Sequence, residues 1–202
     1  HVSSRRQRQM CIRDRYYCAR CLQLTQQSQQ ALAQFNELIE AVPTEENPFH
    51  ERALLESARL HFELGETKLA LEKFKGLADT ASTEAFQQEA VVRGGLLAAE
   101  AGQAEISEEL LNRALRFSDT SPWKALAQVG AIFNAFARED YERVIGIYNV
   151  GAYTPPDESR AKVLLIVAHS YRLMNDLKSA LQLYSLVAVS YTHLTLPTTR
   201  YV

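Results

Sequence analysis

The chain has 202 residues, of which 47% are hydrophobic and 23% are charged, and its formal net charge is −2. This length suffices for one domain or a short repeat array with a continuous core. No apolar run approaches the roughly 18 residues that cross a membrane, so we expect no direct membrane insertion. Ala, Leu, Glu and Gln are abundant, which favours helix almost throughout.

The two ends of the chain differ from its middle. Met10 to Asp14 can be encoded by ATG TGT ATA AGA GAC, and the reverse complement of this string encodes Val189 to His193. Two unrelated peptides on opposite strands of one DNA segment are not expected in a gene, and the string resembles the transposon-end adaptor of sequencing libraries. We therefore interpret residues 1–15 and 189–202 as adaptor-derived, non-native tails and exclude them from fold reasoning. The alternative is a basic arm and a Thr-rich tail.

The adaptor-derived tails suggest a metagenomic, bacterial source, and removing them changes the charge balance. Residues 16–188 contain 16 basic and 23 acidic residues, a formal net charge of −7. Phosphate binding is driven by clustered positive charge, so this balance argues against a nucleic-acid partner and makes helical-repeat RNA binding the weakest option. Cytoplasm and periplasm both remain open as the compartment.

Two cysteines of this segment, Cys18 and Cys21, have C-x-x-C spacing. A zinc site needs two more ligands at suitable spacing, and a thioredoxin-like motif needs a strand-to-helix context. The sequence offers neither, so we expect no metal and predict that both cysteines pack in a helix.

Five helical hairpins follow one another along residues 16–188, each with a polar or glycine break between its two helices. The breaks lie 39, 37, 37 and 36 residues apart, at Gln26, Gly65, Gly102, Glu139 and Asn175. Glycine, and asparagine after it, favours the left-handed conformation that ends a helix. First helices are predicted near residues 12–25, 48–64, 84–101, 122–138 and 157–174. Second helices are predicted near 28–41, 67–79, 104–117, 141–150 and 177–188.

Small and aromatic residues recur at fixed offsets from these breaks. Seven residues before the break are Ala19, Ala58, Gly95, Ile132 and Ala168, and five after it are Ala31, Ala70, Ser107, Val144 and Ala180. Nine after it are Phe35, Phe74, Leu111, Tyr148 and Tyr184. Small side chains let the two helices of a hairpin approach closely, and a large ring fills the space between one hairpin and the next.

These offsets resemble those of the tetratricopeptide repeat (TPR) family over residues 16–188. The family's Leu-Gly-x-x-Tyr, Ala-x-x-x-Phe and closing-proline elements are matched by Val167, Ala168 and Tyr171, by Ala180 and Tyr184, and by Pro43 and Pro156. The usual tryptophan is absent from the first helices, and the third hairpin has Ser107 and Leu111 where alanine and an aromatic are usual. The resemblance implies an all-α fold of about five antiparallel helical hairpins, stacked as a right-handed α-solenoid and forming a fragment of a longer array.

The resemblance also implies that the first helices line a concave groove that binds extended peptides or helices of a partner protein. The candidate groove residues are Arg20, Arg52, Arg59, Phe62, Val92, Phe133, Phe136, Lys162, His169 and Arg172. The hypothesis is that phenylalanines grip an apolar segment of the partner while the cations of Arg52, Arg59, Lys162 and Arg172 pair with its acidic groups. The alternative is that the arginines are solvated and the phenylalanines pack against neighbouring helices.

Catalysis has little support in the sequence. The histidines of residues 16–188 are His50, His61 and His169, and none has a Ser, Cys or Asp at a telling spacing. His61 occupies a position that a core tyrosine usually fills, so we predict that it packs. No Gly-rich phosphate loop, HExxH or GxSxG occurs.

We therefore expect a non-catalytic interaction scaffold with no cofactor. The chief alternative is an accessory region of a larger enzyme or regulator. No polar capping helix is visible at either end of residues 16–188, so we also expect apolar ends capable of self-association.

Overall fold

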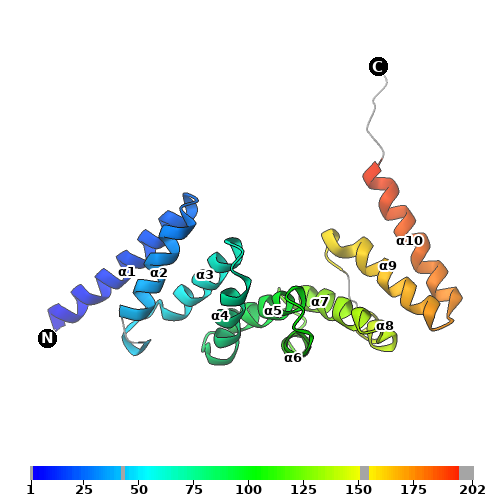
Figure 1. Ribbon diagram of the computed structural model, residues 1–202, viewed down its shortest axis with the longest axis horizontal. Coiled ribbons are helices and arrows are strands. Elements are labelled where there is room, and N and C mark those ends of the chain that lie inside the picture. The colour runs from blue at the N-terminus through cyan, green and yellow to red at the C-terminus, as the bar shows by residue number, and fades with distance from the viewer. Residues whose placement is uncertain (1, 42–43, 151–154, 196–202) are drawn as a thin grey trace, which may run out of the picture. The chain divides into compact units, whose positions relative to one another are not determined.

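The computed structural model describes residues 2–41, 44–150 and 155–195, with side chains placed for 10–41, 44, 46–150 and 155–188. The described residues form ten α-helices and one short 3₁₀ helix, with no strand among them (Figure 1). The elements are α1 (Val2–Leu24), α2 (Ser28–Ala41), η1 (Thr44–Glu46), α3 (His50–Glu63), α4 (Thr67–Thr80), α5 (Glu84–Glu100), α6 (Ala104–Ala114), α7 (Lys124–Ala137), α8 (Tyr141–Asn149), α9 (Asp157–Leu173) and α10 (Leu177–Thr195). The predicted all-α class is confirmed.

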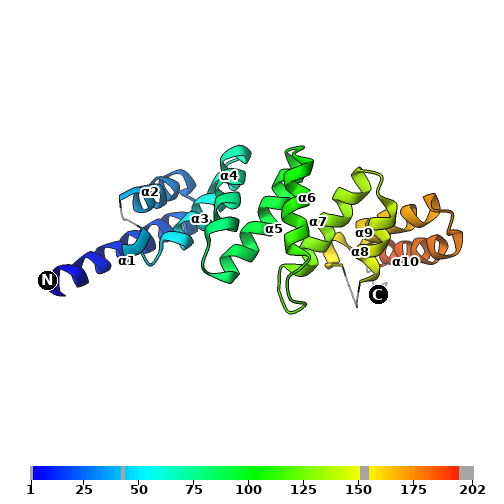
Figure 2. The same cartoon turned by 90° about the horizontal axis from the view of Figure 1, so that it is seen from below.

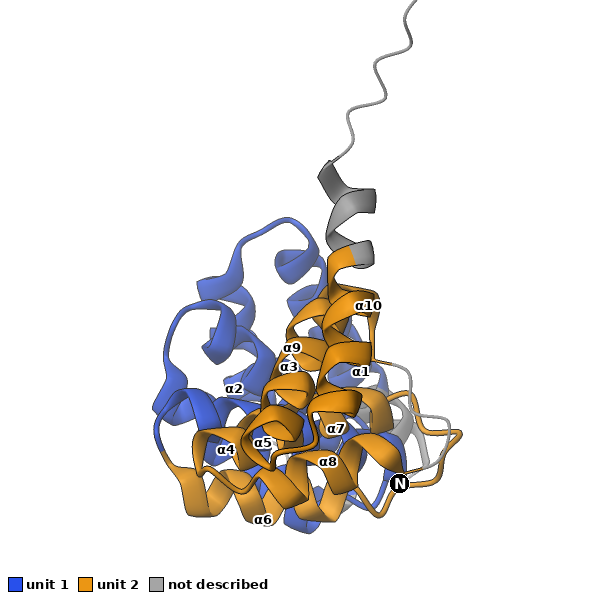
Figure 3. Cartoon of the chain, turned by 90° about the vertical axis from the view of Figure 1, so that its right-hand side faces the viewer, with its two compact units in different colours: residues 1–102 blue, residues 103–202 orange. Residues whose placement is uncertain are grey.

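The helices form two compact units, residues 1–102 with α1 to α5 and residues 103–202 with α6 to α10 (Figure 3). Within each unit, every helix packs against the next one along the chain (Figure 2). First helices of successive hairpins also touch, α3 with α5 in unit 1 and α7 with α9 in unit 2. This neighbour-to-neighbour packing is the pattern of tandem helical repeats.

Both terminal helices run into the predicted tails. α1 begins at Val2 and α10 ends at Thr195. Ile12, which lies in the predicted N-terminal tail, is 3% exposed and belongs to the core of unit 1 together with Tyr16 and Phe35. Helix formation and burial do not bear on the origin of these segments, so the adaptor interpretation stays a prediction.

The five predicted breaks all have a left-handed backbone. Their φ angles are 60° at Gln26, 76° at Gly65, 71° at Gly102, 61° at Glu139 and 63° at Asn175. At four of the five breaks, the following residue donates its N–H to the carbonyl five residues back, over 2.8 to 3.0 Å. This is the hydrogen bond of a Schellman helix end, which satisfies a carbonyl that the helix leaves unpaired. The predicted register of the repeats is thus confirmed.

The small residues at the fixed offsets are buried in every hairpin. Those seven before and five after the break are all buried: Ala19, Ala58, Gly95, Ile132 and Ala168, and Ala31, Ala70, Ser107, Val144 and Ala180. Nine after the break, Phe35, Phe74 and Leu111 are at most 2% exposed, whereas Tyr148 and Tyr184 are only half-buried. The offsets therefore mark buried positions in every hairpin, although the fourth hairpin fills them with Ile132 and Val144 instead of small residues.

The left-handed breaks predict opposite effects for two substitutions. Gly65→Ala is expected to lower the free energy of unfolding by about 1 kcal/mol, because an L side chain at positive φ is strained. No atom lies within 4 Å of the position that the new Cβ would take, so the cost is in the backbone alone. Glu139→Gly is expected to raise it by about 0.5 kcal/mol, because it removes such strain. Urea unfolding followed by far-ultraviolet circular dichroism measures both, and a loss of stability in Glu139→Gly would contradict the strain argument.

Glu51, in the first turn of α3, holds the loop between α4 and α5. Its carboxylate accepts hydrogen bonds from the backbone N–H groups of Ser82, at 2.6 Å, and Thr83, at 3.2 Å. Burial alone would raise the pKa of Glu51, but the hydrogen bonds from Ser82 and Thr83 outweigh it and lower the pKa to about 2. The carboxylate therefore stabilises the fold in its charged form.

Glu51→Gln is expected to cost about 2 kcal/mol of unfolding free energy at pH 7, because two charge-assisted hydrogen bonds are weakened. The folded-state pKa lies below its ordinary value, so this stability is present above about pH 4.5 and is lost as the pH falls towards 2. The gap between the wild type and Glu51→Gln should therefore close over that range. Urea unfolding at several pH values measures it, with Glu72→Gln on the exposed face of α4 as the control. A gap independent of pH would contradict the assignment.

Candidate functional site

Three first helices of unit 1, α1, α3 and α5, surround a cleft of about 440 Å³. Its lining combines aromatic, aliphatic and charged side chains: Tyr16, Tyr17, Arg20, Cys21, Leu24, Arg52, Leu55, Glu56, Arg59 and Phe86. We call this site the α1/α3/α5 cleft.

Aromatic and aliphatic side chains form both the deepest part and the rim of the cleft. Tyr16 is 4% exposed, and its ring stacks on that of Phe49 with centroids 4.7 Å apart. Burial raises the pKa of Tyr16, and the nearby Glu56 carboxylate raises it further, so the phenol stays neutral. In contrast, Tyr17 is 52% exposed and Leu24 is 74% exposed. The cleft therefore offers solvent-facing apolar surface above a packed base.

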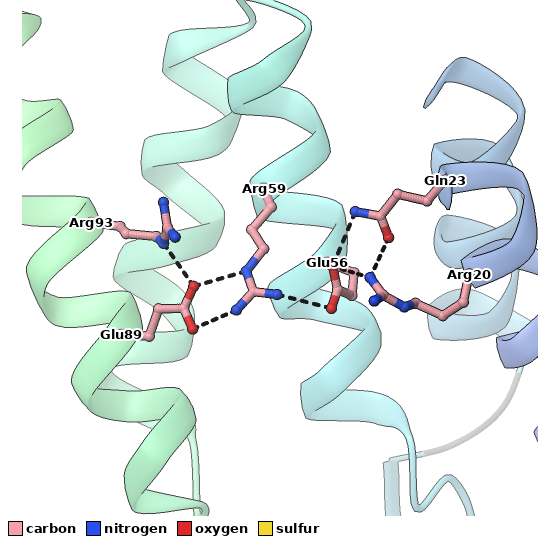
Figure 4. Close-up of polar contacts among 6 residues, drawn as sticks. All are labelled: Arg20, Gln23, Glu56, Arg59, Glu89 and Arg93. Carbon is pink, nitrogen blue, oxygen red and sulfur yellow. Dashed lines mark hydrogen bonds and ion pairs between the residues drawn. The ribbon is translucent and has the colours of Figure 1, made fainter. Parts of the chain in front are cut away.

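Arg59 joins two buried glutamates at the centre of this surface (Figure 4). Its Nε and Nη2 donate to the two carboxylate oxygens of Glu89, at 2.8 and 2.5 Å, and its Nη1 donates to Glu56 at 3.0 Å. Both glutamate side chains are 7% exposed. Burial alone would lower the pKa of Arg59, but hydrogen bonds and the charges of Glu89 and Glu56 raise it. This arginine is therefore held as a permanent cation.

Two further arginines, one on each side of Arg59, also contact the two buried glutamates. Arg20 on α1 contacts Glu56 through Nη1 at 3.0 Å, and Arg93 on α5 donates through Nε to Glu89 at 2.7 Å (Figure 4). Gln23 adds a hydrogen bond to Glu56 at 3.2 Å. The resulting row, Arg20, Glu56, Arg59, Glu89 and Arg93, crosses α1, α3 and α5, and we call it the charge ladder. Buried carboxylates are tolerated only with such partners, so the ladder fixes how these helices face one another.

Arg52 lies on the cleft outside the charge ladder. Its guanidinium carbon is 5.7 Å from the centroid of the Phe86 ring, in a cation–π arrangement. Within the described residues, no carboxylate lies within ion-pair distance of Arg52, and its side chain is exposed. The ring orients the guanidinium while leaving its N–H groups open to solvent.

Solved structures share this arrangement of helices. Nearly identical TPR-like repeats from Podosopora anserina are similar with a TM-score of 0.60 and 17% identity, covering 92% of this chain and 97% of that one. YrrB, a TPR protein with an unusual peptide-binding site, is similar with a TM-score of 0.68 and 13% identity, and the match covers 87% of this chain and 84% of YrrB. MamA from Desulfovibrio magneticus RS-1 is similar with a TM-score of 0.68 and 13% identity, and the match covers 92% of this chain and 97% of that one. The chain has the TPR fold. No protein-family model and no curated protein matches its sequence.

On this TPR fold, the candidate groove residues of unit 1 have different roles. Arg20, Arg52 and Arg59 all line the α1/α3/α5 cleft. All three nitrogens of the Arg59 guanidinium already donate within the charge ladder, which makes it a structural residue. Phe62 is 44% exposed and lines a separate pocket of about 110 Å³ between α3, α4 and α5. Val92 is fully buried, so its assignment to the groove was wrong.

Val92 is buried because α5 packs on both α3 and α4. Three consecutive residues of α5, Ala90, Val91 and Val92, are at most 1% exposed, which covers more of the helix circumference than one core-facing stripe. Offsets from the break identify a helix face, but they do not show how many neighbours cover that helix.

In unit 2, α7 and α9 bring three candidate residues together. The Phe136 ring meets that of His169 edge to face with centroids 6.0 Å apart, and Nη2 of Arg172 lies 3.0 Å from Nε2 of His169. Phe133 is half-buried on α7, and Lys162 is exposed on α9. We call these five residues of α7 and α9 the α7/α9 surface; the described contacts among them join Phe136, His169 and Arg172.

Sequence offsets missed several residues of the cleft. Tyr16, Tyr17 and Phe86 were not predicted to line the cleft. Two adjacent tyrosines on a helix could have indicated it, because only one of them can face the core and the other must face solvent. The glutamates of the charge ladder were also missed. Glu56 stands among apolar and small residues in the run Leu54 to Ala58, and such an isolated acid in a core-facing helix indicates a buried partner.

The cysteine prediction was wrong. Cys18 and Cys21 are exposed free thiols, because the core-facing positions of α1 are taken by Tyr16 and Ala19. Cys21 lines the α1/α3/α5 cleft, whereas Cys18 lines a different surface notch. The two thiols lie one helical turn apart on α1 and line different surface pockets.

The described residues contain no group of three or more His, Cys, Asp or Glu side chains placed to hold a metal ion. Nor does any helix there have the length and apolar character to span a membrane. His61 is 6% exposed with Nδ1 2.5 Å from a Glu66 carboxylate oxygen, so its predicted packing role is confirmed.

Proposed function

We propose that this chain is a non-catalytic interaction scaffold that binds a peptide or helix of a partner protein on its first helices. The observation that carries the proposal is the α1/α3/α5 cleft, where exposed Tyr17 and Leu24 stand beside the arginines Arg20 and Arg52. Aromatic and arginine side chains are enriched at protein interfaces, where a few of them provide most of the binding energy.

The charge ladder supports this function by making the surface rigid before a partner arrives. Its five side chains connect α1, α3 and α5 through ion pairs of 2.5 to 3.0 Å. A surface that is already ordered loses less conformational entropy on binding. YrrB, which shares the fold, has a peptide-binding site, and a peptide is the occupant that we propose here.

The α7/α9 surface of unit 2 is proposed as a second contact area of the same scaffold. Its aromatic part is Phe133 and Phe136, and its cations are Lys162 and Arg172. Phe62, exposed at the end of α3, is proposed to contact the partner from unit 1. Each of these surfaces is proposed to contact a partner segment by itself.

Selection of peptides from a random phage-displayed library on the immobilised chain tests the proposal. Enriched peptides are expected to lose about tenfold in affinity with Leu24→Ala or Tyr17→Ala, because each removes exposed apolar contact area. Leu69→Ala provides the matched control, since Leu69 is 46% exposed but lies on a second helix, α4. Failure to enrich any peptide, or equal sensitivity to Leu24→Ala and Leu69→Ala, would overturn the proposal.

A further inference from the structure

The α1/α3/α5 cleft has a charge opposite to that of the segment that carries it. Residues 16–188 have a formal net charge of −7. The cleft lining contains three arginines and a single glutamate, which gives it a net positive charge. Because the walls around these charges are largely apolar, their field is less screened than on an open surface.

The charge ladder accounts for only part of this positive charge. Arg59 is neutralised within the ladder, since it donates to both Glu89 and Glu56. Arg20, which lines the cleft, makes its contacts with Gln23 and Glu56 through Nη1, so its Nε and Nη2 groups have no described partner. Arg52 has no carboxylate partner among the described residues. Two guanidinium groups of the cleft therefore retain N–H donors.

We propose that the α1/α3/α5 cleft recognises a carboxylate flanked by apolar side chains, so that its occupant is an acidic, hydrophobic peptide segment. This inference rests on the proposed scaffold function and names the chemistry of the partner. Arg52 is the main receiving cation, because its exposed guanidinium lies over the Phe86 ring and has no described carboxylate partner, so its planar donors can make a two-point contact with a carboxylate. Arg20 is the second cation.

The apolar side chains of the peptide would contact the rim of the α1/α3/α5 cleft. Tyr17 and Leu24 are on α1, the helix that also carries Arg20, and both are more than half exposed. A peptide carboxylate placed between Arg20 and Arg52 would lie beside these two side chains. The partner is thus expected to alternate acidic and large apolar residues, and a basic peptide is excluded by like-charge repulsion.

A matched pair of synthetic peptides tests the inference. The first is a fluorescein-labelled peptide in which glutamate alternates with leucine and phenylalanine, and the second has glutamine in place of every glutamate. Fluorescence anisotropy is expected to show at least about tenfold weaker binding of the glutamine peptide. Binding of the acidic peptide is also expected to weaken as salt increases.

Variants of Arg52 separate charge from geometry. Arg52→Gln is expected to lower the affinity for the acidic peptide by about tenfold. Arg52→Lys is expected to recover only part of this lost affinity, because lysine lacks the planar pair of donors. Arg116→Gln removes an exposed arginine after α6 in unit 2 and should leave binding unchanged. Arg52 is exposed and outside the charge ladder, so its replacement leaves the fold intact.

Two of the three thiols of α1, Cys18 and Cys21, locate the bound peptide. Cys21 lines the cleft and Cys18 does not, although both are exposed. The acidic peptide is therefore expected to slow the alkylation of Cys21 by a maleimide while Cys18 reacts at its original rate, as followed by peptide mass spectrometry.

Four results would overturn the inference: no binding of either peptide, equal binding of both, no effect of Arg52→Gln, or no protection of Cys21. None of these would by itself remove the scaffold function, which the library selection tests independently. Library peptides that bind the cleft but lack acidic residues would leave the scaffold standing and refute the acidic partner.

Discussion

Arg59→Ala is expected to lower the free energy of unfolding by about 3 kcal/mol, because removing one partner of a buried ion pair leaves an uncompensated charge. Arg59 supplies three hydrogen bonds to Glu56 and Glu89, whose side chains are 7% exposed. Arg20 and Arg93 would still contact the two glutamates, which keeps the cost at the lower end of that for a broken buried pair. Urea unfolding followed by circular dichroism measures the change.

Two further variants show whether buried charge causes this loss. Replacing Glu56 and Glu89 by glutamine in the Arg59→Ala background should recover part of the stability, because the unpaired carboxylates are then neutral. Arg160→Ala is the matched control, since the Arg160 ion pair with Asp157 is exposed and is expected to contribute less than about 0.5 kcal/mol. A loss below 1 kcal/mol in Arg59→Ala, or no recovery in the triple variant, would show that the ladder does not stabilise unit 1.

The register of the repeats could be predicted because it is encoded locally. Gly65, Gly102 and Asn175 favour positive φ by themselves, and small residues at fixed distances from each break fall on one helix face. Gln26 and Glu139 have no such preference, yet they adopt φ of 60° and 61°. Their neighbours fix the helix ends on both sides, so the periodicity identified them where residue type alone did not.

The cleft could be predicted only in part, because its contacts join residues from different hairpins. Arg59 and Glu89 are 30 residues apart, and Gln23 and Glu56 are 33 apart. The offsets correctly grouped Arg20, Arg52 and Arg59 on one surface, but they could not show which arginine would be neutralised. That outcome depends on where the neighbouring helix places its glutamate, which no pattern within one hairpin contains.

The burial of Val92 on α5 also could not be predicted from the offsets. Val92 was predicted to face the groove, but α5 packs against both α3 and α4 and Val92 is fully buried. Equivalent sequence positions therefore differ in exposure, since Leu165, ten residues before its break as Val92 is, is 45% exposed. The aromatic positions nine residues after each break also differ in exposure.

Phe74→Ala is expected to cost about 4 kcal/mol of unfolding free energy, because it removes a ring that is 2% exposed and leaves a cavity in unit 1. Tyr184 occupies the same place in the repeat, nine residues after a break, but is only half-buried on α10. Tyr184→Ala is therefore expected to cost less, about 1 to 2 kcal/mol, since much of its surface already contacts water.

Comparing these two variants separates burial from repeat position. If position in the repeat determined the contribution, both substitutions would cost the same, whereas burial predicts a gap of at least about 2 kcal/mol. Phe74→Leu refines the test, because leucine keeps most of the volume and should cost about 1.5 kcal/mol or less. Urea unfolding of the three variants decides between the explanations. Equal losses in Phe74→Ala and Tyr184→Ala would mean that a ring half-buried on α10 stabilises the repeat as strongly as one enclosed by helices on every side.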